Sequence, residues 1–386
     1  MIFRTLRTLG FRNLVDAETD TQGKDVFLVG ENGQGKTNFL EAVYFCSYAS
    51  SFRGVLDREV VREGEQQSAV AAHFAGSVTG DGGMDKELLY DQVRVTYEQH
   101  KKTVYLDGKR IEDRRDLLGV APSIVFCHED MEFVTGSPER RRWFFDQTLG
   151  LADPGYLEDL RKYRRVLKTR NTLLKTGAEH HTQTSIGPML DALDPQLAFY
   201  GLKLMEKRQE AATGFSATFG ILYEQVTRLD KLGLRYVPSW KALTLEGIHC
   251  FLGEHRERDM VSGLTLSGPH RDRYLFIRGE TEFAGKASTG QRRLLALLLR
   301  VAQARRFSEL TGKYPVLLLD DVLLELDPEK RWKFLVALPE YAQAFFTFLP
   351  DEPYHRYRTS GALVYQVSQG SLSLASERRS APGHSN

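Results

Sequence analysis

The chain has 386 residues, of which 41% are apolar, so it can bury the core of one large domain or of two ordinary ones. Lysine and arginine total 52 against 51 for aspartate and glutamate, which excludes a general attraction to nucleic acid and leaves any such contact to a local patch. The 3 cysteines lack metal-ligand spacing, and neither a signal-like segment nor a membrane-spanning apolar run occurs, so we expect a cytoplasmic protein.

A phosphate-binding loop is the first chemical feature along the chain. Strand-like alternation within residues 2–20 precedes a buried strand at 25–30 and a helix at 36–49. The turn before that helix reads Gly-Glu-Asn-Gly-Gln-Gly-Lys-Thr, which fits the pattern G-x-x-x-x-G-K-T. Its glycines let backbone N–H groups point inward at a phosphate, Lys36 can reach the β- and γ-phosphates, and the Thr37 hydroxyl can bind Mg²⁺. An ordinary glycine-rich turn is the alternative, which the strand–loop–helix order disfavours.

The following segments favour a small antiparallel sheet beside this loop. Residues 68–78 and 88–111 are rich in strand-forming residues. A break at Gly80–Gly83 separates them, and Asp107-Gly108 is a two-residue hairpin signal.

From about residue 137 the periodicity becomes helical, and it covers 138–150, 154–175, 189–229 and 240–259. The polar stretch 177–187 is expected to link two long helices into a short antiparallel coiled-coil arm. Mixed α/β character returns near residue 264. The expected division is therefore a phosphate-loop domain at 1–136 and 264–375, an inserted helical lobe at 137–263 and a disordered polar tail at 376–386.

The helical lobe carries the best basic patch. At 3.6 residues per turn, four cations of one helix fall within about 100° of one another, while its apolar residues lie on another face. These cations are Arg161, Arg164, Arg165 and Lys168. They are candidates to bind the phosphates of duplex DNA, and a solvated amphipathic helix is the alternative. Arg140–Arg142 forms a second cluster that could serve DNA, a partner or the fold.

Two acids close a second apolar strand far downstream. Residues 316–321 read Val-Leu-Leu-Leu-Asp-Asp, which is typical of a buried parallel strand whose carboxyl end faces a ligand. We expect Asp320 to hold Mg²⁺ through its water shell, and Asp321 to orient or deprotonate the attacking water. Lys36, Asp320 and Asp321 are thus the candidate catalytic residues. A capping pair of acids after a core strand is the alternative.

Between these features, Ser-Thr-Gly-Gln at 288–291 opens an apolar helix. Ser288 is a candidate N-cap and Gly290 allows close approach of another surface, although an ordinary helix cap has the same composition. The order of loop, long intervening chain, Ser-Thr-Gly-Gln helix and acid-ended strand is that of the ATP-binding-cassette class. In that class the Ser-x-Gly-Gln of one subunit covers the γ-phosphate that another subunit holds.

The chain as a whole resembles the RecF family of bacterial recombination-mediator ATPases, which is related to the SMC-type heads. The resemblance extends over nearly the whole chain. The motifs that carry it include Phe11-Arg12-Asn13-Leu14, Gly30–Asn38, Ser51-Phe52-Arg53, Gly136–Arg141, Gly268-Pro269-His270-Arg271-Asp272, Ser288–Gln291 and Leu318–Val322.

The resemblance implies an α/β fold of the ABC/SMC-type ATPase head, with a mixed sheet, flanking helices, a small antiparallel β subdomain and the inserted helical lobe with its arm. It implies ATP and Mg²⁺ as cofactors, an ATP-dependent homodimer, slow DNA-stimulated hydrolysis and binding to duplex DNA at single-strand/double-strand junctions. It also implies work with RecR and RecO to place RecA on gapped DNA, in support of replication and the SOS response. The implied nucleotide-binding residues are Arg12, Gly30, Glu31, Asn32, Gly33, Gln34, Gly35, Lys36, Thr37 and Asn38, with Ser288, Gly290 and Gln291 acting from the second subunit.

Some residues depart from the family pattern. Leu324 replaces a serine after the acid pair, Arg273 replaces a second aspartate, and His128 replaces a proline. Cassette ATPases also use a switch histidine, where this chain has Thr347, which can hydrogen-bond a phosphate oxygen but cannot carry charge. These departures keep open a nucleotide-switched scaffold with negligible hydrolysis. The cassette order alone also permits a transporter subunit, which the basic helical insertion disfavours. His270 could contact a phosphate or a partner, or simply be hydrogen-bonded in its turn.

Overall fold

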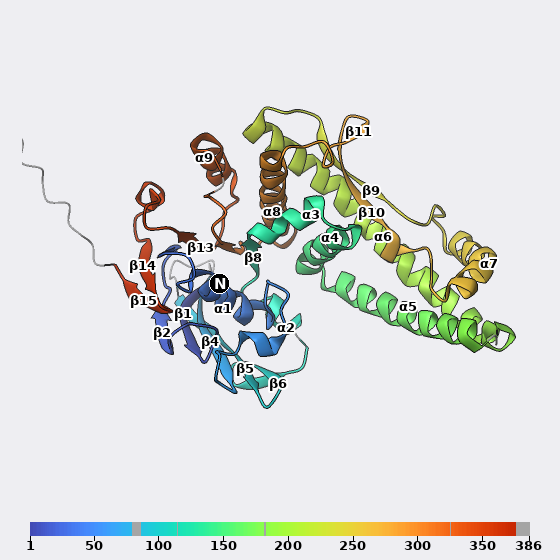
Figure 1. Cartoon of the computed structure of the whole chain (residues 1–386), viewed down its shortest axis with the longest axis horizontal. Helices are drawn as coiled ribbons and strands as arrows, with labels where there is room; N and C mark the ends of the chain where they lie inside the picture. The colour runs from blue at the N-terminus through green and yellow to red at the C-terminus, as the bar shows by residue number, and fades with distance from the viewer. Residues whose placement is uncertain (79–85, 114, 181–182, 325, 376–386) are drawn as a thin grey trace, which may run out of the picture. The chain divides into compact units, whose positions relative to one another are not determined.

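The structure is a computed structural model that describes residues 1–78, 86–113, 115–180, 183–324 and 326–375. The chain divides into two compact units, each of which is described by itself (Figure 1). Unit 1 comprises Met1–Glu129, Tyr314–Glu325 and Glu340–Asn386, and unit 2 comprises Asp130–Lys313 and Leu326–Pro339. The predicted disordered tail at 376–386 lies outside the described residues.

A mixed sheet forms the centre of unit 1, with the strand order β15-β14-β3-β13-β12-β8. Its strands run parallel to one another except β15, which pairs antiparallel with β14. Every residue of β3, β8, β12 and β13 is buried, as expected for parallel strands covered on both faces. The strands are β3 (Asp25–Val29), β8 (Ser123–Phe126), β12 (Val316–Leu319), β13 (Gln343–Phe348), β14 (Leu363–Ser368) and β15 (Ser371–Leu374). Both predicted apolar strands, at 25–30 and 316–319, therefore lie in one sheet.

An antiparallel sheet completes unit 1, in the order β2-β1-β4-β5-β6-β7. Helix α1 (Lys36–Tyr48) contributes Phe39 and Val43 to the core that this sheet shares with the mixed sheet, where they join Val93 and Phe345. Short helices Asp57–Val60 and Arg115–Leu118 lie in the connections. The strands are β1 (Ile2–Leu9), β2 (Ala17–Asp20), β4 (Ser68–Val78), β5 (Lys86–Glu98), β6 (Lys101–Leu106) and β7 (Lys109–Ile111). The predicted antiparallel sheet and its Asp107-Gly108 hairpin are confirmed, whereas the break at Gly80–Gly83 lies outside the described residues.

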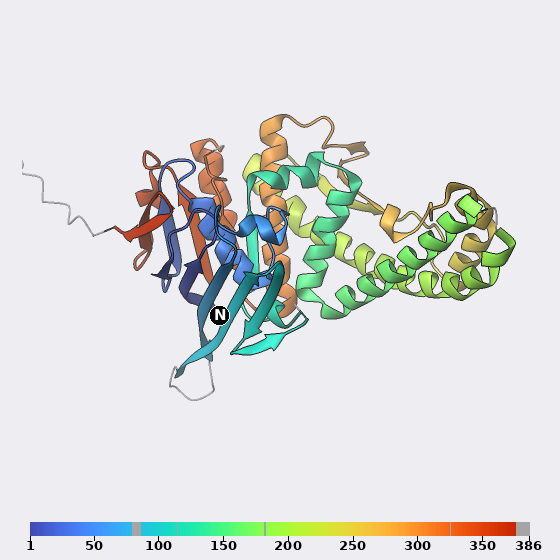
Figure 2. The ribbon, with the colours of Figure 1, turned by 60° about the horizontal axis from the view of Figure 1, so that its bottom comes forward.

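Unit 2 is mainly helical, and α5 and α6 lie side by side along its length (Figure 1, Figure 2). Its helices are α3 (Glu132–Thr135), α4 (Pro138–Ala152), α5 (Pro154–His180), α6 (Gln183–Thr227), α7 (Leu245–Ser262), α8 (Thr289–Thr311) and α9 (Pro328–Ala337). The prediction of a linker at 177–187 was wrong, because α5 continues to His180 and α6 begins at Gln183. Ile186 and Leu190 pack against Leu174, and this tertiary packing stabilises helix where the polar composition favours a loop.

The segment from 264 to 313 differs from its expected place. We assigned it to the phosphate-loop domain, but it belongs to unit 2, where α8 packs against α4 and α6. A buried ion pair also joins α8 to the short helix His128–Met131, since Arg300 Nη2 lies 2.7 Å from a carboxylate oxygen of Asp130. A small antiparallel sheet of β9 (Leu232–Val237), β10 (Arg273–Arg278) and β11 (Thr281–Glu282) also belongs to unit 2. Strand β9 has no counterpart among the predicted elements.

Candidate nucleotide site

The phosphate loop has the geometry that its sequence predicts. It follows β3 and leads into α1, with Gly33 at φ 78° and Gly35 at φ 113°, in a region that favours glycine. A Cβ atom on Gly30 would lie 2.3 Å from the carbonyl oxygen of Val367, so this position has no room for a side chain. The loop therefore needs glycine at these positions both for its backbone turn and for its packing.

Lys36 is buried and turns back over the loop. Its Nζ donates to the carbonyl oxygen of Gly30 at 2.7 Å and to that of Glu31 at 3.2 Å. These contacts hold the ammonium group against the backbone of the loop, where it can bind the phosphate oxygens of a nucleotide.

The tertiary structure brings Thr37 to the acid pair. Thr37 Oγ1 donates to Asp320 Oδ1 at 2.9 Å, although the two residues are 283 positions apart in the chain. Burial, reinforced by the neighbouring Asp321 carboxylate, raises the pKa of Asp320 to about 6, and the Thr37 hydrogen bond and the Arg53 charge oppose this shift. Two adjacent carboxylates with little compensating charge favour the binding of a cation.

The donor set fits Mg²⁺, which takes oxygen ligands and completes its shell with water and substrate phosphates. A hydroxyl from Thr37 and a carboxylate from Asp320 are the groups with which phosphate-loop nucleoside triphosphatases hold Mg²⁺. Among the described residues, no group of three or more His, Cys, Asp or Glu side chains could hold a metal ion.

Asp321 is held by Thr347 at the carboxyl end of β13. Its backbone N–H donates to Thr347 Oγ1 at 2.7 Å, and the same hydroxyl lies 2.7 Å from Asp321 Oδ1. Asp321 has φ 50°, an uncommon value for a residue other than glycine. The hydrogen bonds to Thr347 thus hold Asp321 in an uncommon backbone conformation.

Arg12, which we expect to approach the nucleotide, is bound in this structure to a buried carboxylate of α1. Its Nε and Nη2 each lie 2.9 Å from an oxygen of Glu41, whose side chain is fully buried. Ser51 also donates to Glu41, and Arg53 Nη1 lies 3.6 Å from it. Arg12 and Arg53 are therefore held together by one acid that the sequence analysis did not single out.

Two supports of the loop were also missed. Asn13 Nδ2 donates to the carbonyl oxygen of Gly33 at 3.2 Å, and Asn13 Oδ1 accepts from Asn38 Nδ2 at 2.7 Å. From the β14–β15 turn, the Gly370 N–H donates to the carbonyl oxygen of Gln34 at 2.8 Å. The adjacent Arg12-Asn13 motif was a usable signal for the first support, whereas the second depends on strand pairing.

The Ser-Thr-Gly-Gln segment lies in unit 2 as the start of α8. Ser288 Oγ accepts from the Gln291 N–H at 3.3 Å, and Gln291 Oε1 accepts from the Ser288 N–H at 2.8 Å, which forms a capping box. Ser288 and Gly290 are exposed, and a Cβ on Gly290 would meet open space. The segment is a capped helix start that remains accessible to a second molecule.

The predicted basic face of α5 is exposed. Arg161, Arg164, Arg165 and Lys168 all face solvent, and Arg164 makes a weak ion pair with Asp146 at 3.3 Å. Within the described part of the chain, Arg165 and Lys168 have no carboxylate partner.

Two other candidates serve the fold. His270 Nε2 lies 3.0 Å from the carbonyl oxygen of Thr265, so it carries the proton, and Nδ1 accepts from the Tyr163 hydroxyl at 2.7 Å. Burial lowers the pKa of His270 to about 4, which keeps the ring neutral. In the 140–142 cluster, Arg141 and Arg142 donate to backbone carbonyl oxygens of unit 2.

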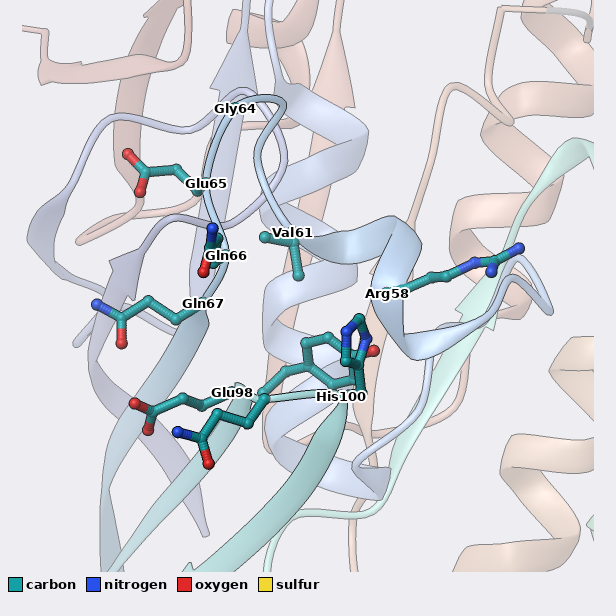
Figure 3. Close-up of a pocket in the computed structure, with 10 residues that line it drawn as sticks. Arg58, Val61, Gly64, Glu65, Gln66, Gln67, Glu98 and His100 are labelled. Carbon is teal, nitrogen blue, oxygen red and sulfur yellow. The ribbon is translucent and has the colours of Figure 1, made fainter.

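A cavity of about 690 Å³ opens beside the antiparallel sheet (Figure 3). Its lining combines Arg58 with the acids Glu65 and Glu98, and it includes no residue of the phosphate loop. It contributes nothing to the predicted nucleotide site.

None of the helices in the described ranges is both long and apolar enough to cross a bilayer.

Comparison with known proteins gives the class and then the family. The chain matches the family described as RecF/RecN/SMC N terminal domain over residues 2–369. It is 40% identical to the DNA replication and repair protein RecF of Treponema pallidum, over 95% of this chain and 99% of the relative. It is 33% identical to RecF of Halalkalibacterium halodurans, over 94% of this chain and 96% of the relative.

Solved structures agree with these relatives. The recombination mediator protein RecF with ATP, from the RecFOR pathway, superposes with a TM-score of 0.84 at 25% identity over 97% of both chains. An SMC head bound to the C-terminal winged-helix domain of ScpA shares the fold, with a TM-score of 0.54 at 15% identity. The fold and the site therefore define an ATPase head of the SMC type, as expected from the sequence. Within that class, the chain belongs to the RecF family.

Proposed function

We propose that this chain is an ATP-dependent DNA-binding protein of recombinational repair that hydrolyses ATP slowly. The observation that carries the proposal is the meeting of Thr37, from the phosphate loop, with Asp320, from the end of β12. The similarity to a RecF protein with bound ATP supports ATP as the nucleotide.

Each residue of the site has a distinct role in this proposal. Lys36 binds the β- and γ-phosphates, while Thr37 and Asp320 hold Mg²⁺, which neutralises charge on the phosphates. Asp321 orients the attacking water and accepts its proton. Asp321 is a short carboxylate and Thr347 is an uncharged residue at the switch position, so we expect slow turnover.

The second half of the site comes from another copy of the chain. The exposed start of α8 presents Ser288, Gly290 and Gln291, whose backbone N–H groups and hydroxyl can close over a γ-phosphate. ATP would then join two molecules, and the dimer would form only with the triphosphate bound.

Duplex DNA is the proposed macromolecular ligand of the basic face of α5. The exposure of Arg161, Arg164, Arg165 and Lys168 supports this proposal. Four phosphate contacts of this kind give a log–log salt slope of about −3 to −4.

The pathway of the solved RecF relative supports RecR and RecO as partners that help place RecA on gapped DNA, with a role in replication and the SOS response.

A nucleotide-switched scaffold with negligible hydrolysis is the second candidate. Leu324 in place of the family's serine, and aspartate rather than glutamate at position 321, favour it. ATP turnover measured with and without duplex DNA separates the two, since a lack of stimulation by DNA supports the scaffold.

Sedimentation with ATP, ADP or no nucleotide, each with and without duplex DNA, tests the main proposal. We expect a doubling of particle mass with ATP alone among the nucleotides, and loss of this doubling in Lys36→Arg. A mass that ATP leaves unchanged, at high protein concentration and with DNA present, would contradict the ATP-dependent dimer.

A further inference from the structure

The antiparallel sheet of unit 1 has one buried face and one exposed face. Along β1, β4, β5 and β6 the residues alternate between the two. The residues on the buried face include Leu6, Val70, Ala72, Val93, Val95 and Val104, all of which belong to the hydrophobic core. Their neighbours in sequence therefore point to solvent.

Three arginines lie in one row across the exposed face. The strand pairings connect Arg7 with Ala71, Ala71 with Arg94, Arg94 with Tyr105, and Tyr105 with Arg110. Paired residues in an antiparallel sheet point to the same face, and adjacent strands lie about 4.8 Å apart. Arg7 and Arg94 are two strands apart, as are Arg94 and Arg110, so their backbone positions are about 10 Å apart along a row of about 20 Å.

The three arginines are exposed and lack carboxylate partners among the residues that the structure describes. Glu18 pairs with Arg7 across β1 and β2, and Glu98 ends β5 on the same face, but neither lies within 4.0 Å of an arginine nitrogen here. Edge protection does not account for Arg7 and Arg94 either, because they lie on the inner strands β1 and β5, whereas Arg110 lies on the edge strand β7.

The face is hollowed beside the row. Small side chains at Ala69 and Ala71 leave a depression of about 240 Å³ that Arg7 and Arg94 border. Leu9, Glu18, His73 and Gln92 also line it, and the Nε2 atoms of His73 and Gln92 lie 3.3 Å apart. An exposed sheet face with a shallow depression and several arginines can bind an extended anion.

We propose that this face binds the sugar–phosphate backbone of duplex DNA through Arg7, Arg94 and Arg110. The inference rests on the proposed DNA-binding function and adds a surface on the ATPase unit to the helical one. Three arginines whose backbone positions span about 20 Å can each bind a separate phosphate of a polyanion, and arginine matches phosphate geometry through two N–H donors.

The test measures binding of a mixed-sequence duplex to the full chain with ATP over a range of salt concentrations. In the triple variant Arg7→Gln, Arg94→Gln, Arg110→Gln we expect the log–log salt slope to become shallower by about 2 to 3, at roughly 0.9 per lost contact. The triple variant with lysine at the same positions should keep most of the slope, because it keeps the charge.

The matched control changes three exposed arginines of unit 2 that also lack a carboxylate partner in the described part of the chain. These are Arg235→Gln, Arg258→Gln and Arg273→Gln, and we expect the control to leave the slope unchanged. If the unmodified chain binds duplex DNA and the sheet variant keeps its slope, the face does not bind DNA and the inference is wrong. An equal loss in the control variant would also overturn it, since the effect would then be one of net charge. If the unmodified chain does not bind duplex DNA, the proposed DNA-binding function fails, and this inference fails with it.

Discussion

Thr347 Oγ1 lies 2.7 Å from Asp321 Oδ1 and accepts the backbone N–H of Asp321 at the same distance. A hydroxyl has one proton, so a Thr347 that donates to Asp321 cannot donate to a phosphate oxygen at the same time. We noted from the sequence that Thr347 can hydrogen-bond a phosphate oxygen, and its contacts in this structure indicate that it orients the acid.

Thr347→Val should therefore slow ATP hydrolysis while leaving ATP affinity nearly unchanged. A hydrogen bond to a charged group contributes about 1.5–3 kcal/mol, which corresponds to about a 10- to 100-fold fall in kcat. Thr347→Ser should restore turnover, because serine keeps the hydroxyl. Single-turnover kinetics provide the measurement. If Thr347 acts through Asp321, adding Thr347→Val to Asp321→Asn has no further effect, and a fully additive loss argues for an independent role.

Asp320 should make the stability of the nucleotide-free protein fall with rising pH. Its pKa rises from 3.8 in the unfolded chain to about 6 in the folded protein, chiefly through burial. Between these values the folded protein binds a proton that the unfolded chain has released, so the free energy of unfolding decreases as pH rises through this window. Above this pH window the free energy of unfolding stays lowered by the full amount.

Asp320→Asn should accordingly be more stable than the unmodified chain at pH 8, by up to about 3 kcal/mol at 1.4 kcal/mol per pKa unit, and should not hydrolyse ATP. Urea unfolding without Mg²⁺ should show the difference shrinking below pH 6. Asp327→Asn is the control, since Asp327 is exposed and hydrogen bonding to Lys330 lowers its pKa, so its replacement should give no gain. A gain in stability for Asp320→Asn that is constant from pH 8 to pH 5 would falsify the raised pKa of Asp320.

Gly370→Ala should weaken ATP binding through the phosphate loop. A Cβ at this position would lie 1.8 Å from the carbonyl oxygen of Asn13, which supports Gly33. Displacement of Asn13 should lower ATP affinity by about tenfold or more, equivalent to about 1.4 kcal/mol. Gly361→Ala is matched in backbone, with φ 82° against 77°, but its Cβ meets open space. Titration with ATP should show a loss in the first variant alone, and equal losses would mean that backbone strain is the cause.

Ser288→Ala should abolish ATP-driven dimerisation as well as remove a helix cap. The lost cap costs about 1 kcal/mol of stability. Thr244→Ala removes the equivalent cap of α7, where Thr244 Oγ1 accepts from the Gly247 N–H at 3.1 Å, and it has no predicted contact with nucleotide. Both variants should lose similar stability in thermal unfolding. Dimerisation that survives in Ser288→Ala would show that the serine is only a cap.

The local features of the site could be predicted because short-range physics determines them. Glycines at fixed spacing, a lysine and a threonine at a helix start, and an apolar strand that ends in acids each specify a chemistry without reference to the rest of the chain. The parallel sheet also followed from its unbroken apolar strands. Helix limits in the arm were harder to predict, because packing of Ile186 and Leu190 on Leu174 outweighed the polar composition around them.

By itself, the sequence predicted which residues would bind the phosphates and the cation, since backbone geometry and residue type set such roles locally. Only the tertiary structure decided how these residues are held: Glu41 on Arg12 and Arg53, Thr347 on Asp321, and the Gly370 turn on the loop. It also aligned Arg7, Arg94 and Arg110 in one row. Such contacts join residues tens to hundreds of positions apart, and no local pattern encodes them, because they depend on strand order and register.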